Sequence, residues 1–496
     1  MFVRICSAAA LFAVACSAHA KLTCADVLKA LSRELADATC FQSEDLTTRN
    51  PLTTPPDNPF PDLSFTPRTD RTVISPKEGT PIDKVVPGLQ IQARIASDPL
   101  GQARFLLRLP NNWNGRLVVA GASGTRSEFN GDFAWSDYVV QKGYAYASQN
   151  KGVLNLQFTN SADPLGCRLN PDSPVFVHFF DNDPGQVFTR WTQFMVKAGE
   201  LAREGVKAGY GQPPRYVYAV GTSNGGYQVR RAIETAPQLF DGGVDWEGTF
   251  VDDHAPNLLT DLPPAVLNFP AYRASNFDKT TTAAKNIVAA GYPPDIDSDV
   301  VAGTTLWNRN WIQFWEVTLC QWQKRLDPGY DTYDTVPPAG DGGTGTYKYI
   351  NRLSFSNVGA EMAAFANSGK VKRPLVTVAG TMDALLPIDH HARAYARKVA
   401  AASKDKHDHD ADERGDKRSA YRLYEVQNGN HIETYKQDFF SKLEFIQPHA
   451  QHAFDLVVQQ VEHGQTLPPD QCIPRGGSIS DSPGAQAGHC ASFFVP

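Results

Sequence analysis

One short run, residues 216–227, constrains the fold of this chain more than any other part of its sequence. It reads Tyr-Val-Tyr-Ala-Val-Gly-Thr-Ser-Asn-Gly-Gly-Tyr: an apolar stretch typical of a buried strand, the pattern Gly-x-Ser-x-Gly, and the start of a helical pattern. A serine at so sharp a strand-to-helix turn presents its hydroxyl above the edge of a sheet, and small flanking residues let strand and helix approach each other. The run therefore predicts Ser223 as a nucleophile.

Strand and helix patterns alternate along much of the chain. Apolar runs bounded by turn residues predict strands at 104–109, 116–121, 144–148, 215–221, 375–380 and 421–426. Helical patterns lie at 191–208, 225–234, 391–401 and 449–463. Such alternation favours a mostly parallel central sheet with helices on both faces, because parallel strands are joined by crossover helices. We therefore predict an α/β fold.

The 496 residues, 42% of them hydrophobic, are enough for one large domain with an insertion. Residues 256–358 interrupt the alternation, and we expect them to form an inserted lid. The expected order is a signal peptide at 1–20, an irregular N-terminal segment at 21–92, a first part of the core at 93–255, the lid, and a second part of the core with a C-terminal disulfide loop at 359–496.

The first twenty residues have the features of a secretory signal peptide. A positive start and an Ala-rich apolar stretch precede the small-x-small sequence Ala18-His19-Ala20. Because the apolar stretch is too short to span a bilayer, we expect cleavage and a secreted or periplasmic protein without a membrane partner. A lipoprotein attached at Cys16 is the alternative.

Six cysteines follow the predicted signal, and in an exported chain they suggest up to three disulfides. The economical pairing joins sequence neighbours and leaves one long-range pair: Cys24 with Cys40, Cys472 with Cys490, and Cys167 with Cys320. The sequence alone allows fifteen connectivities for six cysteines, so the pairing stays open at this point. No spacing of cysteine and histidine is typical of a zinc site.

The charge of the chain limits its partners. The net charge of −6 is mild and no basic face is evident, so we expect no nucleic-acid partner. Residues 404–418 are dense in charge, and their core, His407-Asp408-His409-Asp410, could hold a metal. We expect a solvated loop there, because nothing fixes those side chains in place. No metal and no organic cofactor are predicted.

A serine hydroxyl is a weak nucleophile at neutral pH and needs an imidazole that a carboxylate holds in the right tautomer. In hydrolases with this kind of turn, the chain order is nucleophile, acid, histidine. Asp383 follows the apolar run that ends at Gly380, in a loop closed by Pro387. His431 follows the last predicted strand through a turn that contains Gly429. We therefore predict Asp383 as the acid and His431 as the base.

Other residues compete for these roles. Asp389 is the alternative acid, although it could instead cap the start of a helix. The competing histidines occupy a helix start, the segment after the nucleophile helix, or a late helix: His390, His391, His254, His449 and His452. A surface position or a satisfied core position is the plainer interpretation of each of them.

The negative charge of a tetrahedral intermediate needs two backbone donors. Asn224 opens the helix after the nucleophile, so its N–H lies at the positive end of the helix dipole. The second donor should come from the small residues at 121–125, which follow an early strand. Ala122 and Ser123 are both candidates there, and we favour Ala122.

Three tryptophans in the expected lid, Trp307, Trp311 and Trp315, recur every four residues and would share one helical face. That face could line an acyl pocket over Ser223, and these residues are our substrate-binding candidates. Packing of the same face against the main domain is the alternative, and it is the more common fate of such a stripe.

These features together resemble the α/β-hydrolase superfamily, and within it the tannase and feruloyl esterase group. The resemblance is carried by residues 109–116, 142–145 and 240–242, by the Ser223 turn, by the large lid, and by Asp383 and His431. That group has paired cysteines just before the serine and the histidine, whereas this chain has Thr222 and Asn430. The Ser-Asn-Gly-Gly turn is also similar to that of secreted hydroxybutyrate-oligomer hydrolases.

The resemblance implies a secreted serine esterase acting through an acyl-enzyme, on aromatic esters of the feruloyl or galloyl type or on polyester oligomers. Its partner would then be a small-molecule or oligomeric ester. A secreted serine peptidase of the same fold is one alternative, but no propeller domain is evident. A binding protein without activity is the other, although it would have no reason to keep Ser223, Asp383 and His431.

Overall fold

The structure, a computed structural model, describes residues 22–54, 79–124, 127–153, 157–158, 167, 175–176, 188–327, 348–354, 357–407, 421–484 and 488–496. The predicted signal peptide and residues 408–418 of the charge-dense segment lie outside these ranges. In the described part of the chain, no helix is both long enough and apolar enough to cross a membrane.

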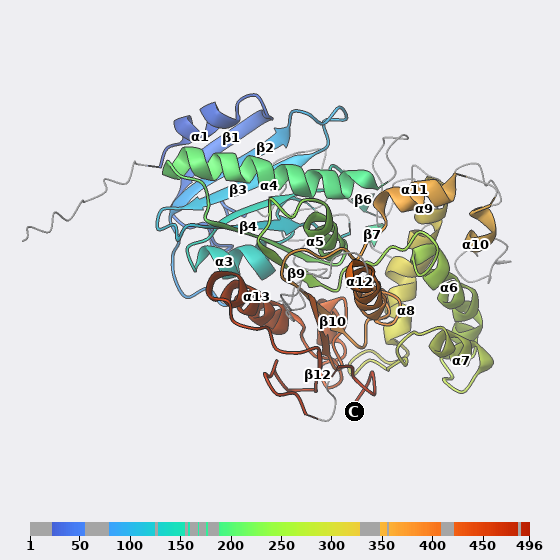
Figure 1. The fold of residues 1–496 in the computed structure, drawn as a ribbon. Helices are drawn as coiled ribbons and strands as arrows, with labels where there is room; N and C mark the ends of the chain where they lie inside the picture. Colours follow the sequence, from blue (N-terminus) through green and yellow to red (C-terminus); the bar gives the residue numbers. More distant parts are fainter. Residues whose placement is uncertain are drawn as a thin grey trace, which may run out of the picture.

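A ten-stranded sheet forms the centre of the molecule (Figure 1). In spatial order its strands are β1 (Leu35–Ser43), β2 (Gly88–Ile95), β3 (Arg104–Pro110), β5 (Ala145–Gln149), β4 (Arg116–Gly121), β8 (Tyr216–Thr222), β9 (Gly242–Trp246), β10 (Leu375–Gly380), β11 (Tyr421–Val426) and β12 (Gln471–Ile473). The pairs from β1 to β5 are antiparallel, and every pair from β5 to β12 is parallel. A separate two-stranded sheet joins β6 (Gln157–Phe158) and β7 (Val175–Phe176).

Helices cover both faces of the ten-stranded sheet and bury an apolar layer on each (Figure 1). On one face lie α1 (Cys24–Leu31), α4 (Thr189–Tyr210), α5 (Asn224–Thr235) and α12 (Ala392–His407). On the other lie α3 (Asp137–Val140), which continues the π-helical turn η1 (Asp132–Ser136), and α13 (Gln447–His463). The predicted mostly parallel sheet with helices on both faces is therefore confirmed.

Four strands of the large sheet were not predicted from the sequence: β1, β2, β9 and β12. Residues 21–92, predicted to be irregular, contain α1 and β1 and most of β2. Exposure explains why β1 was missed, because it is an edge strand in which only the two end residues are buried and the residues between them are half-buried or exposed. Strand β9 was missed because Asp245 interrupts its apolar pattern. This aspartate is buried against Arg230 and Thr377.

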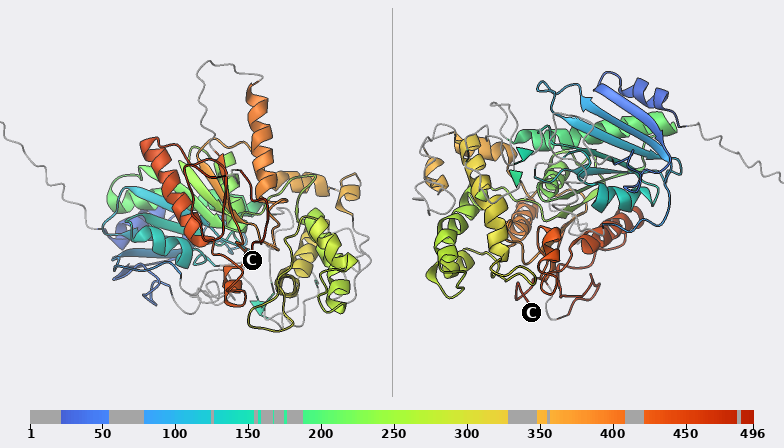
Figure 2. Two further views of the ribbon diagram at one scale, coloured as in Figure 1. Left: turned by 90° about the horizontal axis from the view of Figure 1, so that it is seen from below. Right: turned by 180° about the vertical axis from the view of Figure 1, so that it is seen from behind.

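The segment between β9 and β10 forms a helical unit that includes the predicted lid, residues 256–358. Its elements are α6 (Leu258–Ala274), α7 (Thr282–Ala289), α8 (Leu306–Asn310), the π-helical turn η2 (Trp311–Trp315), α9 (Glu316–Leu326), α10 (Tyr349–Arg352) and α11 (Val358–Phe365). Both views of Figure 2 place these helices together, on the side of the molecule away from α1 and β1. They share an apolar core with the loop that follows β10.

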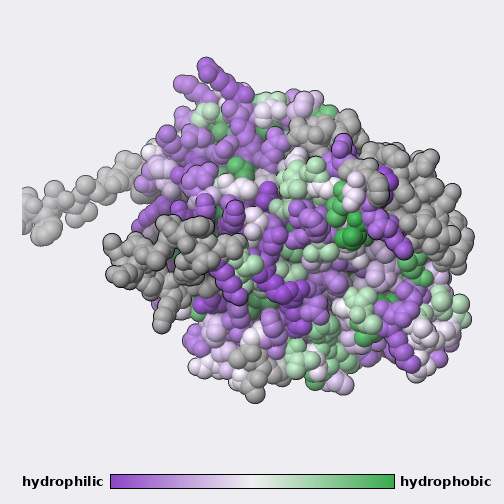
Figure 3. Space-filling model, turned by 45° about the vertical axis from the view of Figure 1, so that its right-hand side comes forward, coloured by the Kyte–Doolittle hydropathy of each residue, from purple (hydrophilic) through white to green (hydrophobic). Residues whose placement is uncertain are grey.

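The surface is mixed in polarity. On the face drawn in Figure 3, hydrophobic residues are interspersed with hydrophilic ones. Among the described residues of the helical unit, exposed large apolar side chains are few, for example Val288 and Val300, whereas the aromatic residues are buried except for the half-buried Phe277. Isolated exposed residues of this kind are normal, so the apolar content of the unit is used mainly in packing.

Three disulfides join the six cysteines in the economical pairing. They link Cys24 to Cys40, Cys472 to Cys490, and Cys167 to Cys320. The predicted pairing is therefore confirmed. The long-range bond ties Cys320 in α9 of the helical unit to Cys167, which lies between β6 and β7 in the sequence. The two cysteines are 153 residues apart.

Glycines let backbone segments meet at the carboxyl end of the sheet. A Cβ atom added at Gly121, the end of β4, would lie 2.6 Å from the carbonyl oxygen of Gly225 in α5. A Cβ atom added at Gly429 would lie 2.9 Å from the Cα atom of Gly380, the end of β10. Because backbone atoms cannot move aside as a flexible side chain can, these contacts require glycine.

We expect Gly225→Ala to destabilise the protein, because its new Cβ atom would lie 2.8 Å from the carbonyl carbon of Gly121. Overpacking against backbone should lower the free energy of unfolding by about 2 kcal/mol or more. Gly484→Ala is the control, since nothing lies within 4 Å of its Cβ position. Thermal unfolding of both variants checks this, and equal midpoints would refute the proposed constraint.

Candidate active site

Four neighbouring parallel strands each deliver one polar side chain to the same edge of the sheet. Ser223 follows β8, Glu247 follows β9, Asp383 follows β10 and His431 follows β11. Carboxyl ends of parallel strands lie at a common edge, which is where α/β proteins bind ligands. Three of these residues were predicted from sequence, and Glu247 was not.

Ser223 has a strained backbone at the start of α5. Its φ is 60° and its ψ is −123°, a conformation that side chains rarely adopt. Its N–H donates to the carbonyl oxygen of Trp246 at 2.9 Å, which holds the turn against the end of β9. Ser223 is half-buried, whereas its neighbours Thr222 and Asn224 are buried. The turn therefore presents the one serine and shields the residues beside it.

Asp383 and His431 form a buried pair. The Nδ1 atom of His431 lies 2.8 Å from Oδ2 of Asp383, and each residue is 2% exposed. The other carboxylate oxygen of Asp383 accepts the N–H groups of Leu385 and Leu386 at 2.8 and 2.6 Å. Since one oxygen is held by the loop, the other is fixed toward the imidazole. An Nδ1–H bonded to a carboxylate leaves Nε2 of His431 as a proton acceptor.

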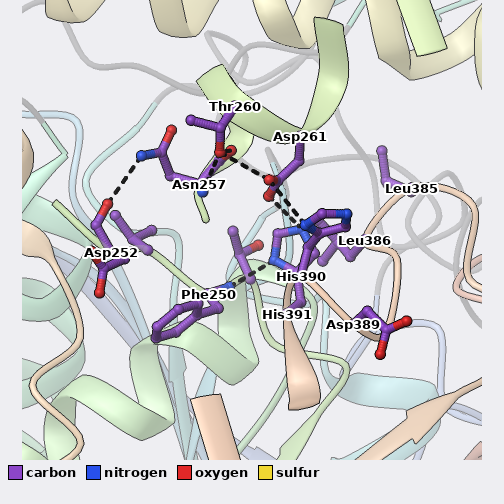
Figure 4. Close-up of polar contacts among 12 residues, drawn as sticks. Phe250, Asp252, Asn257, Thr260, Asp261, Leu385, Leu386, Asp389, His390 and His391 are labelled. Atoms are coloured by element: carbon purple, nitrogen blue, oxygen red, sulfur yellow. Dashed lines mark hydrogen bonds and ion pairs between the residues drawn. The ribbon is translucent and has the colours of Figure 1, made fainter. Parts of the chain in front are cut away.

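The alternative acid and the histidines beside it have other partners. Asp389 binds Arg393, with 3.1 Å between Oδ1 and Nη1. Figure 4 shows that His390 and His391 face Asp261 of α6. The N–O distances are 3.3 Å from His390 and 3.6 Å from His391. The Nδ1 atom of His391 accepts the N–H of Phe250 at 2.9 Å. These histidines therefore connect the helical unit to the core.

Burial disfavours the charged forms of both Asp261 and His391. It raises the pKa of Asp261 well above its ordinary value and lowers the pKa of His391 well below its own. The other competing histidines lie elsewhere. His254 is exposed beside Asp253, and His449 lies on α13, where burial lowers its pKa to about 4. His452 lies on the same helix.

The loop after β4 is held by a buried network of side chains. The N–H of Ser123 donates to Oδ1 of Asn130 at 2.8 Å, so Ala122 is the remaining candidate for a backbone donor. Lys151, fully buried, donates from Nζ to the carbonyl oxygen of Ser123 at 2.9 Å. Gln228 donates from Nε2 to the carbonyl oxygen of Ala122 and to Oδ1 of Asn224, both at 2.8 Å. Gln228 thus joins the two predicted oxyanion residues.

Two sets of described side chains could hold a cation. Each offers one ligand atom per residue within 4.8 Å of the others: Glu247 with Asp383 and His431, and Asp252 with Asp253 and His254. In the first set, the 2.8 Å contact between Nδ1 of His431 and Oδ2 of Asp383 is a hydrogen bond. These two atoms are therefore already paired with each other. The second set is partly exposed.

The tryptophans proposed for substrate binding are packed in the core instead of lining an open surface. Trp307, Trp311 and Trp315 are at most 1% exposed. Trp311 stacks on Phe269 of α6, and Nε1 of Trp315 donates to the carbonyl oxygen of Ala384 at 2.8 Å. The packing alternative describes this position better. Trp315 nevertheless ties the helical unit to the loop of Asp383.

Sequence reasoning missed Glu247, Gln228 and Lys151. A carboxyl directly after a strand is a usable signal, and Asp383 was found by it, but β9 itself went unrecognised. Gln228 lies one helical turn after Asn224, so its closeness to the first oxyanion residue could have been inferred from helical spacing. No local signal marks Lys151.

Known proteins resemble this chain in two ways. Residues 349–494 match the family model of the 3HB-oligomer hydrolases. The D-(-)-3-hydroxybutyrate oligomer hydrolase of Burkholderia thailandensis is 26% identical over 161 residues, which cover 31% of this chain and 21% of that protein. That of Burkholderia cenocepacia is 30% identical over 126 residues, 24% of this chain and 16% of that protein. The chain thus spans less than a quarter of the length of these relatives.

The likeness to solved structures covers nearly the whole chain. Feruloyl esterase B from Aspergillus oryzae superposes with a TM-score of 0.51 at 14% identity, over 90% of this chain and 91% of that one. At such identity the likeness establishes the fold. The chain therefore has the α/β-hydrolase fold, and it resembles both the tannase and feruloyl esterase group and the 3HB-oligomer hydrolases.

Proposed function

We propose that the protein is a serine carboxylic-ester hydrolase with Ser223 as nucleophile, His431 as base and Asp383 as acid. One observation carries the proposal: a strained serine at a strand-to-helix turn stands two strands from a buried Asp383–His431 pair of 2.8 Å. A binding protein has no need of backbone strain at a serine. Strain of this kind is typical of functional sites.

The residues supply each step of acyl transfer. Nε2 of His431 takes the proton of the Ser223 hydroxyl as its oxygen attacks the ester carbonyl, and Asp383 stabilises the imidazolium that forms. Backbone N–H groups of Asn224 and Ala122 receive the oxyanion. His431 then gives the proton to the oxygen of the leaving alcohol. The alcohol departs, and the acyl group stays on Ser223 as an acyl-enzyme. Water, activated by His431, hydrolyses the acyl-enzyme in the same way.

Short oligomers of a hydroxyacid are the substrate class that we favour. The sequence likeness to 3HB-oligomer hydrolases covers residues 349–494, which contain Asp383 and His431. The structural likeness to a feruloyl esterase covers 90% of the chain but concerns the fold alone. Thr222 and Asn430 also stand where the tannase and feruloyl esterase group has its paired cysteines. Aromatic esters are therefore the second class to test.

Export fits this function. Disulfides persist in oxidising compartments, and the described part of the chain contains three of them. We infer that residues 1–20 are removed as a signal peptide and that the enzyme works in the periplasm or outside the cell. N-terminal sequencing of the exported protein should find a start at Lys21.

The purified protein should hydrolyse 3-hydroxybutyrate oligomers faster than feruloyl, galloyl or short p-nitrophenyl esters. Ser223→Ala should lower kcat by about 10⁴-fold or more, because members of such a triad act as a unit. Ser403→Ala is the matched control, since its hydroxyl donates to Val399 of its own helix. Product release followed by titration or chromatography checks both statements. Full activity of Ser223→Ala would exclude the mechanism, and inactivity on every ester would favour a binding protein.

Gln228→Met should reduce kcat by about 10–100-fold while KM changes little. The substitution keeps the volume but removes the bonds that hold Ala122 and Asn224, and oxyanion donors act mainly in the transition state. Gln451→Met serves as the control, because that buried glutamine bonds Ala134 and Thr80 on the opposite face of the sheet. Steady-state kinetics on the preferred ester measure both. A rise in KM alone would show that Gln228 serves binding instead.

A further inference from the structure

A second carboxyl group stands beside the Asp383–His431 pair. Oε2 of Glu247 lies 3.7 Å from Nδ1 of His431, the atom that Asp383 also contacts. This oxygen has no hydrogen-bond partner among the described residues, and Glu247 is 3% exposed. A buried oxygen without a partner is costly, so its position beside an imidazole calls for an explanation.

The backbone fixes Glu247 in this position. The φ of Glu247 is positive, at 51°, and Ser223, which follows the neighbouring strand β8, also has a positive φ. Its N–H donates to the carbonyl oxygen of Val378 at 2.8 Å, and its Oε1 accepts the N–H of Gly380 at 3.0 Å. Both partners belong to β10, which leads into the loop of Asp383. One carboxylate oxygen is therefore anchored, and the other is left facing the imidazole.

The surroundings oppose a negative charge on Glu247 while His431 is neutral. Burial, and next the nearby Asp383 carboxylate, raise the pKa of Glu247 well above its ordinary value. Glu433, the second acid that raises the pKa of Glu247, is buried as well, and burial raises the pKa of Glu433 to about 8. His431 is the nearby cation once it takes a proton. A positive charge on His431 would therefore favour the ionised form of Glu247.

We propose that Glu247 is a positioning residue for His431: its unbonded oxygen shares the imidazolium charge with Asp383 during turnover and accepts the Nδ1–H when Asp383 is removed. The inference rests on the proposed function, because it assigns a partner to the same base. No covalent bond changes, and Glu247 does not touch the substrate.

The first test replaces Asp383 by alanine, alone and together with Glu247→Ala. Loss of the acid alone costs about 10⁴-fold in kcat where nothing can replace it. Here Asp383→Ala should cost only about 100-fold, and the added Glu247→Ala should bring the loss back to about 10⁴-fold. Alanine is used at both positions because a carboxamide side chain would offer an N–H to the imidazole and select the wrong tautomer. Thermal unfolding checks that each variant is folded.

The second test keeps Asp383, in case its loss disturbs the loop. Glu247→Gln should move the acid limb of the kcat/KM profile to lower pH by about one unit, because the imidazolium loses a partner that favours the charged form. The KM should stay unchanged. Asp261→Asn is the matched control, a buried acid whose partners are His390 and His391, and it should leave the limb in place.

The outcomes separate this inference from the function on which it rests. If the wild type cleaves esters and Ser223→Ala does not, the function stands. An Asp383→Ala variant as inactive as the double variant, or an acid limb that Glu247→Gln leaves unmoved, would then overturn the role of Glu247 alone. A wild type inactive on every ester would overturn both.

Discussion

The site depends on two backbone contacts that only glycine permits. At one, Gly121 of β4 meets Gly225 of α5, and this contact brings the loop of Ala122 to the start of the nucleophile helix. At the other, Gly380 of β10 meets Gly429, which joins the loops of Asp383 and His431. Neighbouring strands are about 4.8 Å apart, so loops at their ends come closer than this only where no side chain intervenes. Without these contacts, the polar groups at the edge of the sheet would lie too far apart to act together.

Burial makes the polar groups of the site both costly and effective. Asp383 and His431 are nearly inaccessible, and the carboxylate is held by two backbone N–H groups as well as by the imidazole. A hydrogen bond is stronger at low local dielectric, and groups fixed in advance need no rearrangement during reaction. The same burial leaves Glu247 with an oxygen that has no bond among the described residues. The site therefore accepts an energetic cost in the ground state that a charged imidazole would offset.

The sequence revealed those parts of the site that have a local signal. Ser223 stands in a five-residue pattern between a strand and a helix, and Asp383 and His431 each follow an apolar run of typical strand length. Glu247 was not predicted because the strand before it, β9, was not recognised. The buried Asp245, which pairs with Arg230, interrupts the apolar pattern of that strand. The bond of Gln228 to Ala122 and that of Lys151 to Ser123 join segments that are distant in sequence, which no periodicity encodes.

Periodicity can indicate a shared face, but it does not show what the face meets. Trp307, Trp311 and Trp315 are spaced as for a helical stripe, and the stripe is buried inside the helical unit. Strand β1 was missed because, as a half-exposed edge strand, it buries only its two end residues, and its sequence therefore contains no apolar run.

The most direct test of the central claim is covalent labelling of the intact protein with a fluorophosphonate, followed by mass spectrometry and peptide mapping. An activated serine should take up one phosphonyl group at Ser223, none should appear in Ser223→Ala, and labelling should be much slower in His431→Ala. A folded protein that remains unlabelled, or one labelled at another residue, would contradict the account of Ser223 as the nucleophile.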